Sequence, residues 1–433
     1  MLPHKLISII TFFFFFTPSL FIPPCSSSSS FLSPITKDHE TNLYTLTLYL
    51  KTPPQLTPLL LDLSASFSWM DCSIPSSTHR SLSCNSPLCS ALGSRACAKC
   101  FNSHSPDDCS SNPCILTPSN SVTHKSSTGK AIVEALALAV TDGRNPGQVK
   151  GFSEFLLSCS KKCLLKGLMK GVAGLAGLGR SNFSLSTQIS TSFVSTRTFA
   201  LCVSDSPSAP GVAFFGSAGP YYFLPQIDLS KTLNYTPLIL NPGQPDYFIN
   251  LTSIKVNGVS IQLNQTILAV DQHGFGGTTK LSTVTPYTTL HSNIYKAFTE
   301  TFVNESTKLN LTLTNAMEPF NVCYNADEVL DTTVGPMVPT VDLVMNSDDV
   351  FWRIFGSNSM VRIARDGVDV WCLGFLDGEI KNMTAMIIIG GHQMENNLLQ
   401  FDLEQQRLGF SSSVLAYKTS CSNFNFTTSS NLS

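Results

Sequence analysis

Apolar and polar residues alternate in short runs along this chain, and residues that favour turns bound each run. Leu43–Leu50 alternates like a half-buried strand, and the apolar run Leu59–Asp62 follows the break at Pro53–Pro54. Similar runs predict further strands at 199–203, 212–215, 249–256, 260–263, 386–391, 398–403 and 407–410. Repeated short strands between Pro, Gly and Asn turns predict an all-β fold with a few short helices.

Three segments depart from this pattern. Ser292–Phe302 carries apolar residues at helical spacing and predicts a helix. Ile132–Val140 is rich in helix formers, but a hairpin fits equally well beside the turn pair Asp142–Gly143. Gly171–Arg180 predicts a glycine-rich strand and turn that run into a short helix at Ser184–Gln188. It lacks the spacing of a dinucleotide-binding loop.

Composition indicates an exported protein. The 433 residues suit two or three domains, and a net charge of −2 with 13% charged residues favours neither nucleic acid nor an anionic membrane as partner. Lys5, the apolar run Leu6–Phe16 and the small residues after it predict a signal peptide at 1–25. That run is too short to span a bilayer, and no later segment is apolar enough.

The cysteines fit an oxidising compartment. Of 14 cysteines, Cys25 is expected to leave with the signal, and seven of the remainder fall between positions 72 and 114. We therefore expect a disulfide-rich insertion at 73–121 rather than a zinc knuckle, although Cys97, Cys100, Cys109 and Cys114 would allow one. An odd mature count leaves one free thiol, for which we select Cys163.

Glycosylation sequons also suit a secreted, extracellular protein of the cell wall space. Nine Asn-x-Ser/Thr sequences occur, at Asn182, Asn234, Asn250, Asn264, Asn304, Asn310, Asn382, Asn425 and Asn431.

The run that ends in Asp62 carries the candidate chemistry. A strand that delivers an acid into a tight turn is one half of a two-carboxylate hydrolase, which needs a second acid to share a proton. The run resembles the Asp-Thr/Ser-Gly signature of pepsin-like aspartic proteases, with Leu63–Ser64 in place of Thr/Ser-Gly. Gly171–Arg180, Ile387–Gly391 and Phe401–Phe410 resemble plant pepsin-like proteins in order and spacing.

The resemblance implies a bilobal pepsin-like fold, with an N-terminal β lobe at 26–228 and a C-terminal β lobe at 229–433. A closer resemblance is to extracellular dermal glycoproteins, xyloglucanase and xylanase inhibitors and basic 7S globulins. It rests on Gly276–Leu290, Gly356–Met360, Ile389–Gln393 and Thr419–Phe426. This subgroup implies a six-bridge framework in which Cys202 pairs with Cys421 and Cys323 with Cys372.

The second acid is missing. Ser282 stands where the resemblance requires Asp, and no carboxylate occurs between Asp271 and Glu300. A serine hydroxyl does not titrate usefully, so it cannot complete the dyad. We therefore expect no enzyme activity and interpret Asp62 and Ser282 as relic positions. No other catalytic motif, metal site or cofactor site is evident.

The resemblance implies a monomeric inhibitor of secreted microbial glycoside hydrolases, such as a xyloglucan endoglucanase or a xylanase. Its relatives insert two loops into the target's cleft, here the loop with Lys418 and Thr419 and the loop with Leu313. Glucanase-inhibiting relatives carry arginine at positions 418 and 313.

Two alternatives stay open: an atypical endopeptidase with an acid from Asp271, and a storage or peptide-binding protein. The isoelectric point near 6.4 suits a basic globulin poorly.

Overall fold

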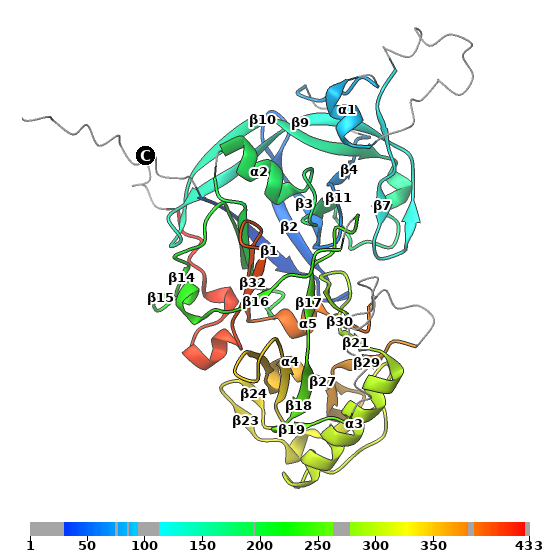
Figure 1. Cartoon of the computed structure of the whole chain (residues 1–433), viewed down its shortest axis with the longest axis vertical. Coiled ribbons are helices and arrows are strands. Elements are labelled where there is room, and N and C mark those ends of the chain that lie inside the picture. The colour runs from blue at the N-terminus through cyan, green and yellow to red at the C-terminus, as the bar shows by residue number, and fades with distance from the viewer. Residues whose placement is uncertain are drawn as a thin grey trace, which may run out of the picture.

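Two lobes lie one above the other in the computed structural model of the protein (Figure 1). The structure describes residues 30–73, 77–84, 86–93, 112–193, 195–241, 243–262, 278–379 and 385–428. The predicted signal peptide and part of the predicted insertion lie outside these ranges. Within them, no helix has the length and apolar character that crossing a membrane requires.

Short strands make up most of the regular structure, so the all-β prediction is confirmed. In the first half of the chain the strands are β1 (Ser30–Lys37), β2 (Tyr44–Leu50), β3 (Gln55–Asp62), β4 (Trp69–Asp71), β5 (Arg80–Ser81), β6 (Ile115–Leu116), β7 (Ser119–Asn120), β8 (Lys125–Ser126), β9 (Gly129–Thr141), β10 (Pro146–Ser160), β11 (Gly174–Gly177), β12 (Thr198–Cys202), β13 (Gly211–Phe215), β14 (Tyr222–Phe223) and β15 (Ile227–Asp228). In the second half they are β16 (Asn234–Pro237), β17 (Phe248–Asn250), β18 (Ser253–Val256), β19 (Val259–Ser260), β20 (Thr278–Leu281), β21 (Thr288–Leu290), β22 (Cys323–Asn325), β23 (Asp331–Thr332), β24 (Gly335–Pro336), β25 (Val341–Val344), β26 (Phe351–Ile354), β27 (Met360–Arg365), β28 (Val368–Leu373), β29 (Phe375–Asp377), β30 (Ile387–Ile389), β31 (Leu398–Asp402) and β32 (Arg407–Phe410).

The helices are few and mostly short. They are α1 (Pro87–Ala91), η2 (Lys162–Leu165), α2 (Leu185–Phe193), η3 (Leu229–Thr232), α3 (Ser292–Thr307), η4 (Ala326–Glu328), α4 (Gly356–Ser359), α5 (Gly391–Met394), η5 (Val414–Tyr417) and η6 (Cys421–Asn423). The predicted helix at Ser292–Phe302 is confirmed as α3, and Ile294, Phe298 and Phe302 form its buried face.

One large sheet forms the upper lobe and continues toward the lower one. It runs in the order β16-β32-β31-β12-β13-β1-β2-β3-β11-β4-β10-β9-β5, with β6 attached to β9. Strands β16, β31 and β32 come from the predicted C-terminal lobe, and β31 pairs with β12 of the N-terminal lobe. The predicted division after residue 228 therefore separates strands of one continuous sheet.

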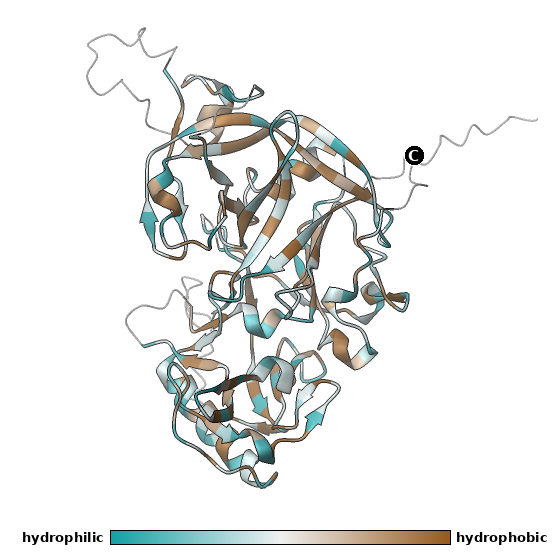
Figure 2. Ribbon diagram, turned by 180° about the vertical axis from the view of Figure 1, so that it is seen from behind, coloured by the Kyte–Doolittle hydropathy of each residue, from teal (hydrophilic) through white to brown (hydrophobic). Residues whose placement is uncertain are grey.

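The long hairpin of β9 and β10 resolves the ambiguity over Ile132–Val140. The segment is a strand, because its apolar residues pack on both faces and Asp142–Gly143 forms the turn, where the Arg144 N–H donates to Asp142. Gly143 adopts a φ of +89°, and a Cβ there would lie 1.9 Å from the carbonyl oxygen of Pro220. Figure 2 shows both apolar and hydrophilic stretches along the long strands of the upper lobe, seen from behind.

The lower lobe carries smaller sheets against α3. A five-stranded sheet has the order β17-β20-β30-β21-β29, and a four-stranded sheet has the order β19-β18-β25-β26. The single strand predicted at Ile249–Val256 is wrong, because the chain turns at Leu251–Thr252 and its two halves enter different sheets. A run of apolar residues alone does not reveal such a change of sheet.

Candidate functional site

Asp62 ends β3, and buried strands deliver its carboxylate to the junction of the lobes. β3 runs parallel to β11, where Gly177 lies opposite Asp62. The carboxylate accepts hydrogen bonds from the Ser64 N–H at 2.7 Å and from the Ser121 hydroxyl. Burial raises the pKa of Asp62 above its usual value, although these hydrogen bonds and the charge of Lys280 act in the opposite direction.

Ser282 occupies the corresponding place in the lower lobe. It follows β20, which runs parallel to β30, and its N–H donates to the carbonyl of Ile389 at 3.0 Å. The Ser282 side chain is 2% exposed, and its hydroxyl lies 2.9 Å from the hydroxyl of Thr285. Ser282 thus directly follows the end of β20, and its assignment to the position of the second acid stays a prediction.

Thr283 of the lower lobe contacts the end of β3 in the upper lobe. Its hydroxyl donates to the Leu61 carbonyl at 2.7 Å and accepts from the Leu63 N–H at 3.2 Å. All three residues are buried. A single side chain therefore fixes the strand end that carries Asp62 against the one that carries Ser282.

Charge near Asp62 comes from an ion pair that the sequence reading missed. Lys280, on β20, pairs with Asp246, and both side chains are 16% exposed. Lys280 lowers the pKa of Asp62, whereas Asp246 raises it. The only sign of this ion pair in the sequence was the position of Lys280, two residues before Ser282. Asp271, the acid considered for an atypical peptidase, lies outside the described residues.

These groups do not form a proton-sharing pair of acids. Among the described residues, Asp246 is the other carboxylate whose charge acts on Asp62, and it forms an ion pair with the Lys280 ammonium group. General acid–base cleavage of a peptide needs one carboxylate to donate while the other accepts a proton. The Ser282 hydroxyl does not titrate in the useful range, and the absence of enzyme activity stays a prediction.

A second polar cluster joins the lobes around Glu395, which follows α5. Its carboxylate accepts from the Lys37 ammonium at 2.7 Å and from the Tyr44 hydroxyl at 2.6 Å, both on strands of the upper lobe. His392 Nδ1 lies 3.3 Å from the same carboxylate. Burial alone would raise the pKa of Glu395, but His392 and Lys37 hold it below its usual value.

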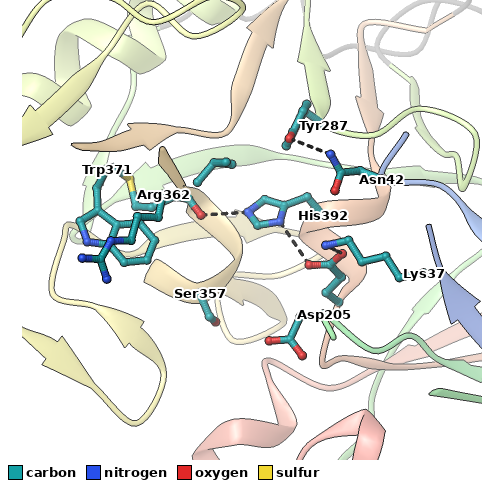
Figure 3. A pocket seen from close by; sticks show the side chains of 11 residues that line it. Lys37, Asn42, Asp205, Tyr287, Ser357, Arg362, Trp371 and His392 are labelled. Carbon is teal, nitrogen blue, oxygen red and sulfur yellow. Dashed lines mark hydrogen bonds and ion pairs between the residues drawn. The ribbon is translucent and has the colours of Figure 1, made fainter. Parts of the chain in front are cut away.

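A cavity of about 220 Å³ opens beside this cluster. Figure 3 shows His392 at its centre, with Lys37 and Asn42 on one side and Arg362 and Trp371 on the other. Both ring nitrogens of His392 have partners, since the second one lies 3.0 Å from the Met360 carbonyl oxygen.

The predicted disulfides Cys202–Cys421 and Cys323–Cys372 are present, and so are Cys72–Cys159 and Cys89–Cys114. Cys163 is free and exposed, as predicted. Because Cys114 is bonded to Cys89, the zinc-knuckle alternative lacks that ligand. His79 lies near Cys72 and Cys159, but their sulfurs are joined and are not available as thiolate ligands.

The glycosylation sequons remain predictions, and the structure places six of the nine. Their asparagines are exposed at Asn182, Asn234, Asn304 and Asn310 and half-buried at Asn250 and Asn425. Asn264, Asn382 and Asn431 lie outside the described residues.

Comparison with known sequences decides the family. A profile described as xylanase inhibitor N-terminal matches residues 44–217, and one described as xylanase inhibitor C-terminal matches residues 246–412. The chain belongs to the xylanase inhibitor family. Among its relatives, "Probable aspartic proteinase GIP1" of Glycine max is 47% identical over 95% of this chain and 94% of that protein.

Solved structures show the same fold. That of edgp matches with a TM-score of 0.86 and 42% identity, over 92% of this chain and 98% of that one. An aspartic proteinase from Irpex lacteus matches with a TM-score of 0.56 and 13% identity, over 90% of this chain and 99% of that one. The predicted bilobal pepsin-like fold is therefore confirmed.

The structure places both loops that are expected to carry partner binding in this member of the xylanase inhibitor family. Lys418 is exposed on the turn after η5, with a φ of +58°. Thr419 is buried, and its hydroxyl donates to the Leu224 carbonyl at 2.6 Å, so it holds the turn rather than facing solvent. Leu313, between α3 and β22, is 49% exposed. No hydrogen bond joins Leu313 to Lys418 or Thr419 within the described ranges.

Proposed function

We propose that this protein is a catalytically inactive, secreted member of its family that binds and inhibits microbial cell-wall glycoside hydrolases. The observation that carries the proposal is the buried Ser282 at the strand end opposite Asp62. The Lys280–Asp246 ion pair beside it supports inactivity, because it leaves Asp62 without an acid that can exchange a proton.

The exposed side chains Lys418 and Leu313 support binding to a hydrolase. Glycoside hydrolases cleave with a pair of carboxyl groups in a cleft, so a protruding ammonium group suits such a target. Lys418 projects from a turn that Thr419 anchors, which reduces the entropy lost when the loop binds. Lysine lacks the planar, bidentate geometry of arginine, so we expect weaker inhibition than an arginine would give.

The test is a titration of purified hydrolases with the full glycoprotein. Fungal xyloglucan endoglucanase and xylanase are assayed on their polysaccharides with increasing inhibitor, and at least one should lose activity at micromolar inhibitor or below. Unchanged activity of both enzymes across that range would refute the proposal.

An atypical aspartic endopeptidase is the second candidate, because Asp62 and the Thr283 bridge are both present. An acid-pH digestion of denatured haemoglobin, with and without pepstatin, separates the two functions. Pepstatin-sensitive cleavage that disappears in Asp62→Asn would favour the peptidase.

A further inference from the structure

Exposed lysines gather on two packed segments of the upper lobe. The first segment is the β7–β8 hairpin and the start of β9, and the second is the turn that follows β10 and contains η2 (Figure 1). We call their exposed cationic residues the basic face; they are Lys125, Lys130, Lys161, Lys162, Lys166 and Lys170, with His124 beside them.

Direct contacts hold the two segments together. The Asn120 side-chain amide donates to the carbonyls of Leu164 at 2.9 Å and Lys166 at 3.2 Å. A Cβ at Gly167 would lie 2.5 Å from the Thr123 side chain, so these turns are in close contact. Lys130 on β9 lies opposite Cys159 on β10, and Cys159 precedes Lys161 by two residues. The two segments that carry the basic face are thus in direct contact with each other.

Acidic residues are absent from both segments. No Asp or Glu occurs in residues 112–133 or 155–204, although the whole chain has a net charge of −2. In the described part of the protein, no lysine of the basic face forms an ion pair. The neighbouring acids Asp71 and Asp38 accept hydrogen bonds from Ser73 and Thr41.

We propose that the basic face binds an acidic polysaccharide, a polymer that carries a carboxylate on successive sugar residues. This goes beyond the inhibition of a hydrolase, which involves other loops. Unpaired lysines close together repel one another, and a polyanion relieves that repulsion and releases its own counterions. Lysine acts as a flexible point charge and suits a polymer whose carboxylates vary in position.

The composition of the surface argues against a protein or a membrane as occupant. Protein interfaces are depleted in lysine and enriched in aromatic residues and arginine. The large exposed apolar side chains of the described chain all lie outside residues 112–133 and 155–172. Membrane-surface binding by lysines is usually accompanied by apolar side chains that enter the lipid, and these segments expose none of that size.

The experiment measures binding of the full-length mature protein to polygalacturonate at several salt concentrations. The test variant replaces Lys125, Lys161, Lys162 and Lys166 by Gln. The control replaces four exposed cations elsewhere by Gln, namely Lys150, Lys231, Lys296 and Arg365. Because both variants lose four charges, a difference between them reports the position of the charges rather than their number.

We expect the wild type to bind more weakly as salt rises, and the test variant to bind about tenfold more weakly at low salt with a shallower salt dependence. The control should bind within about threefold of the wild type. Equal binding by both variants would overturn the proposal, and so would tighter binding to phosphatidylserine vesicles than to polygalacturonate. Hydrolase inhibition, assayed in parallel, should be unchanged in the test variant. A failure of the polysaccharide proposal can therefore be told apart from a failure of the proposed hydrolase inhibition.

Discussion

Thr283 of the lower lobe donates its hydroxyl to the carbonyl of Leu61 in the upper lobe at 2.7 Å. The same oxygen accepts from the Leu63 N–H at 3.2 Å, so one side chain satisfies two buried backbone groups across the lobe junction. One buried side chain therefore links the strand end that carries Asp62 to the strand end that carries Ser282.

Replacing Thr283 by Val should destabilise the protein by about 2 kcal/mol, because two buried backbone groups lose their partner while the side-chain volume is kept. Urea unfolding at pH 7 measures the change. Thr45→Val is the matched control, since the hydroxyl of Thr45 makes one long bond of 3.4 Å on the exposed side of β2. If the two variants are equally stable, Thr283 does not hold the lobes together.

Asp62→Asn should increase stability at neutral pH. The folded state raises the pKa of Asp62, mainly by burial, so folding favours the protonated carboxyl. Wild-type stability therefore falls as pH rises from the unfolded pKa of about 3.9 through the folded value, and Asn at this position avoids that loss. Unfolding curves of the two proteins should converge below pH 4. A less stable Asp62→Asn at pH 7 would contradict the electrostatic argument.

The sequence could predict features whose cause is local. Asp62 at a strand end, the apolar face of α3 and the strand Arg407–Phe410 follow from short-range patterns that the structure confirms. Glu395 could not be recognised, because its partner Tyr44 lies 351 residues away. The ion pair of Lys280 and Asp246 was hidden for the same reason, since it depends on how β17 pairs with β20.

Glu395→Gln should weaken the junction of the lobes in a pH-dependent way. His392 and Lys37 hold the pKa of Glu395 below its usual value despite burial, so its charge stabilises the fold above the unfolded pKa of about 4.3. That stability is lost as pH falls through the folded value. At pH 7 the variant should lose about 3 kcal/mol, because Lys37 keeps a charge without its partner.

The matched control for Glu395 is Glu154→Gln, whose partner Arg80 is exposed. Both side chains of that pair are more than 60% exposed, so its removal should cost less than about 1 kcal/mol at any pH. Chemical unfolding at pH 7 and pH 3 compares the variants. A Glu395→Gln deficit that is the same at both pH values would show that the loss is one of packing and not of charge.

Cys163→Ser should leave stability unchanged, because Cys163 is exposed and free in η2. Labelling of the native protein with a thiol reagent should fall by one equivalent relative to the wild type. Cys202→Ser is the contrasting variant, and it should destabilise the protein by about 2–5 kcal/mol through loss of the bond to Cys421. A rise in the thiol count of Cys163→Ser would place this cysteine in a disulfide, because its former partner would then be free.

Lys418→Glu should raise the inhibition constant for a sensitive hydrolase about tenfold or more, because a carboxylate would replace an ammonium group facing the acidic pair of the target. Lys418 is exposed and makes no ion pair with any described residue, so the substitution should not change the melting temperature.

Lys418→Arg should inhibit at least as well as the wild type, since the guanidinium can form two parallel hydrogen bonds with a carboxylate. Lys296→Glu, on the exposed side of α3, makes the same charge change away from the loop and should leave the inhibition constant unaltered. Equal inhibition by Lys418→Glu and Lys296→Glu would remove position 418 from the binding site and leave Leu313 as the side chain to test.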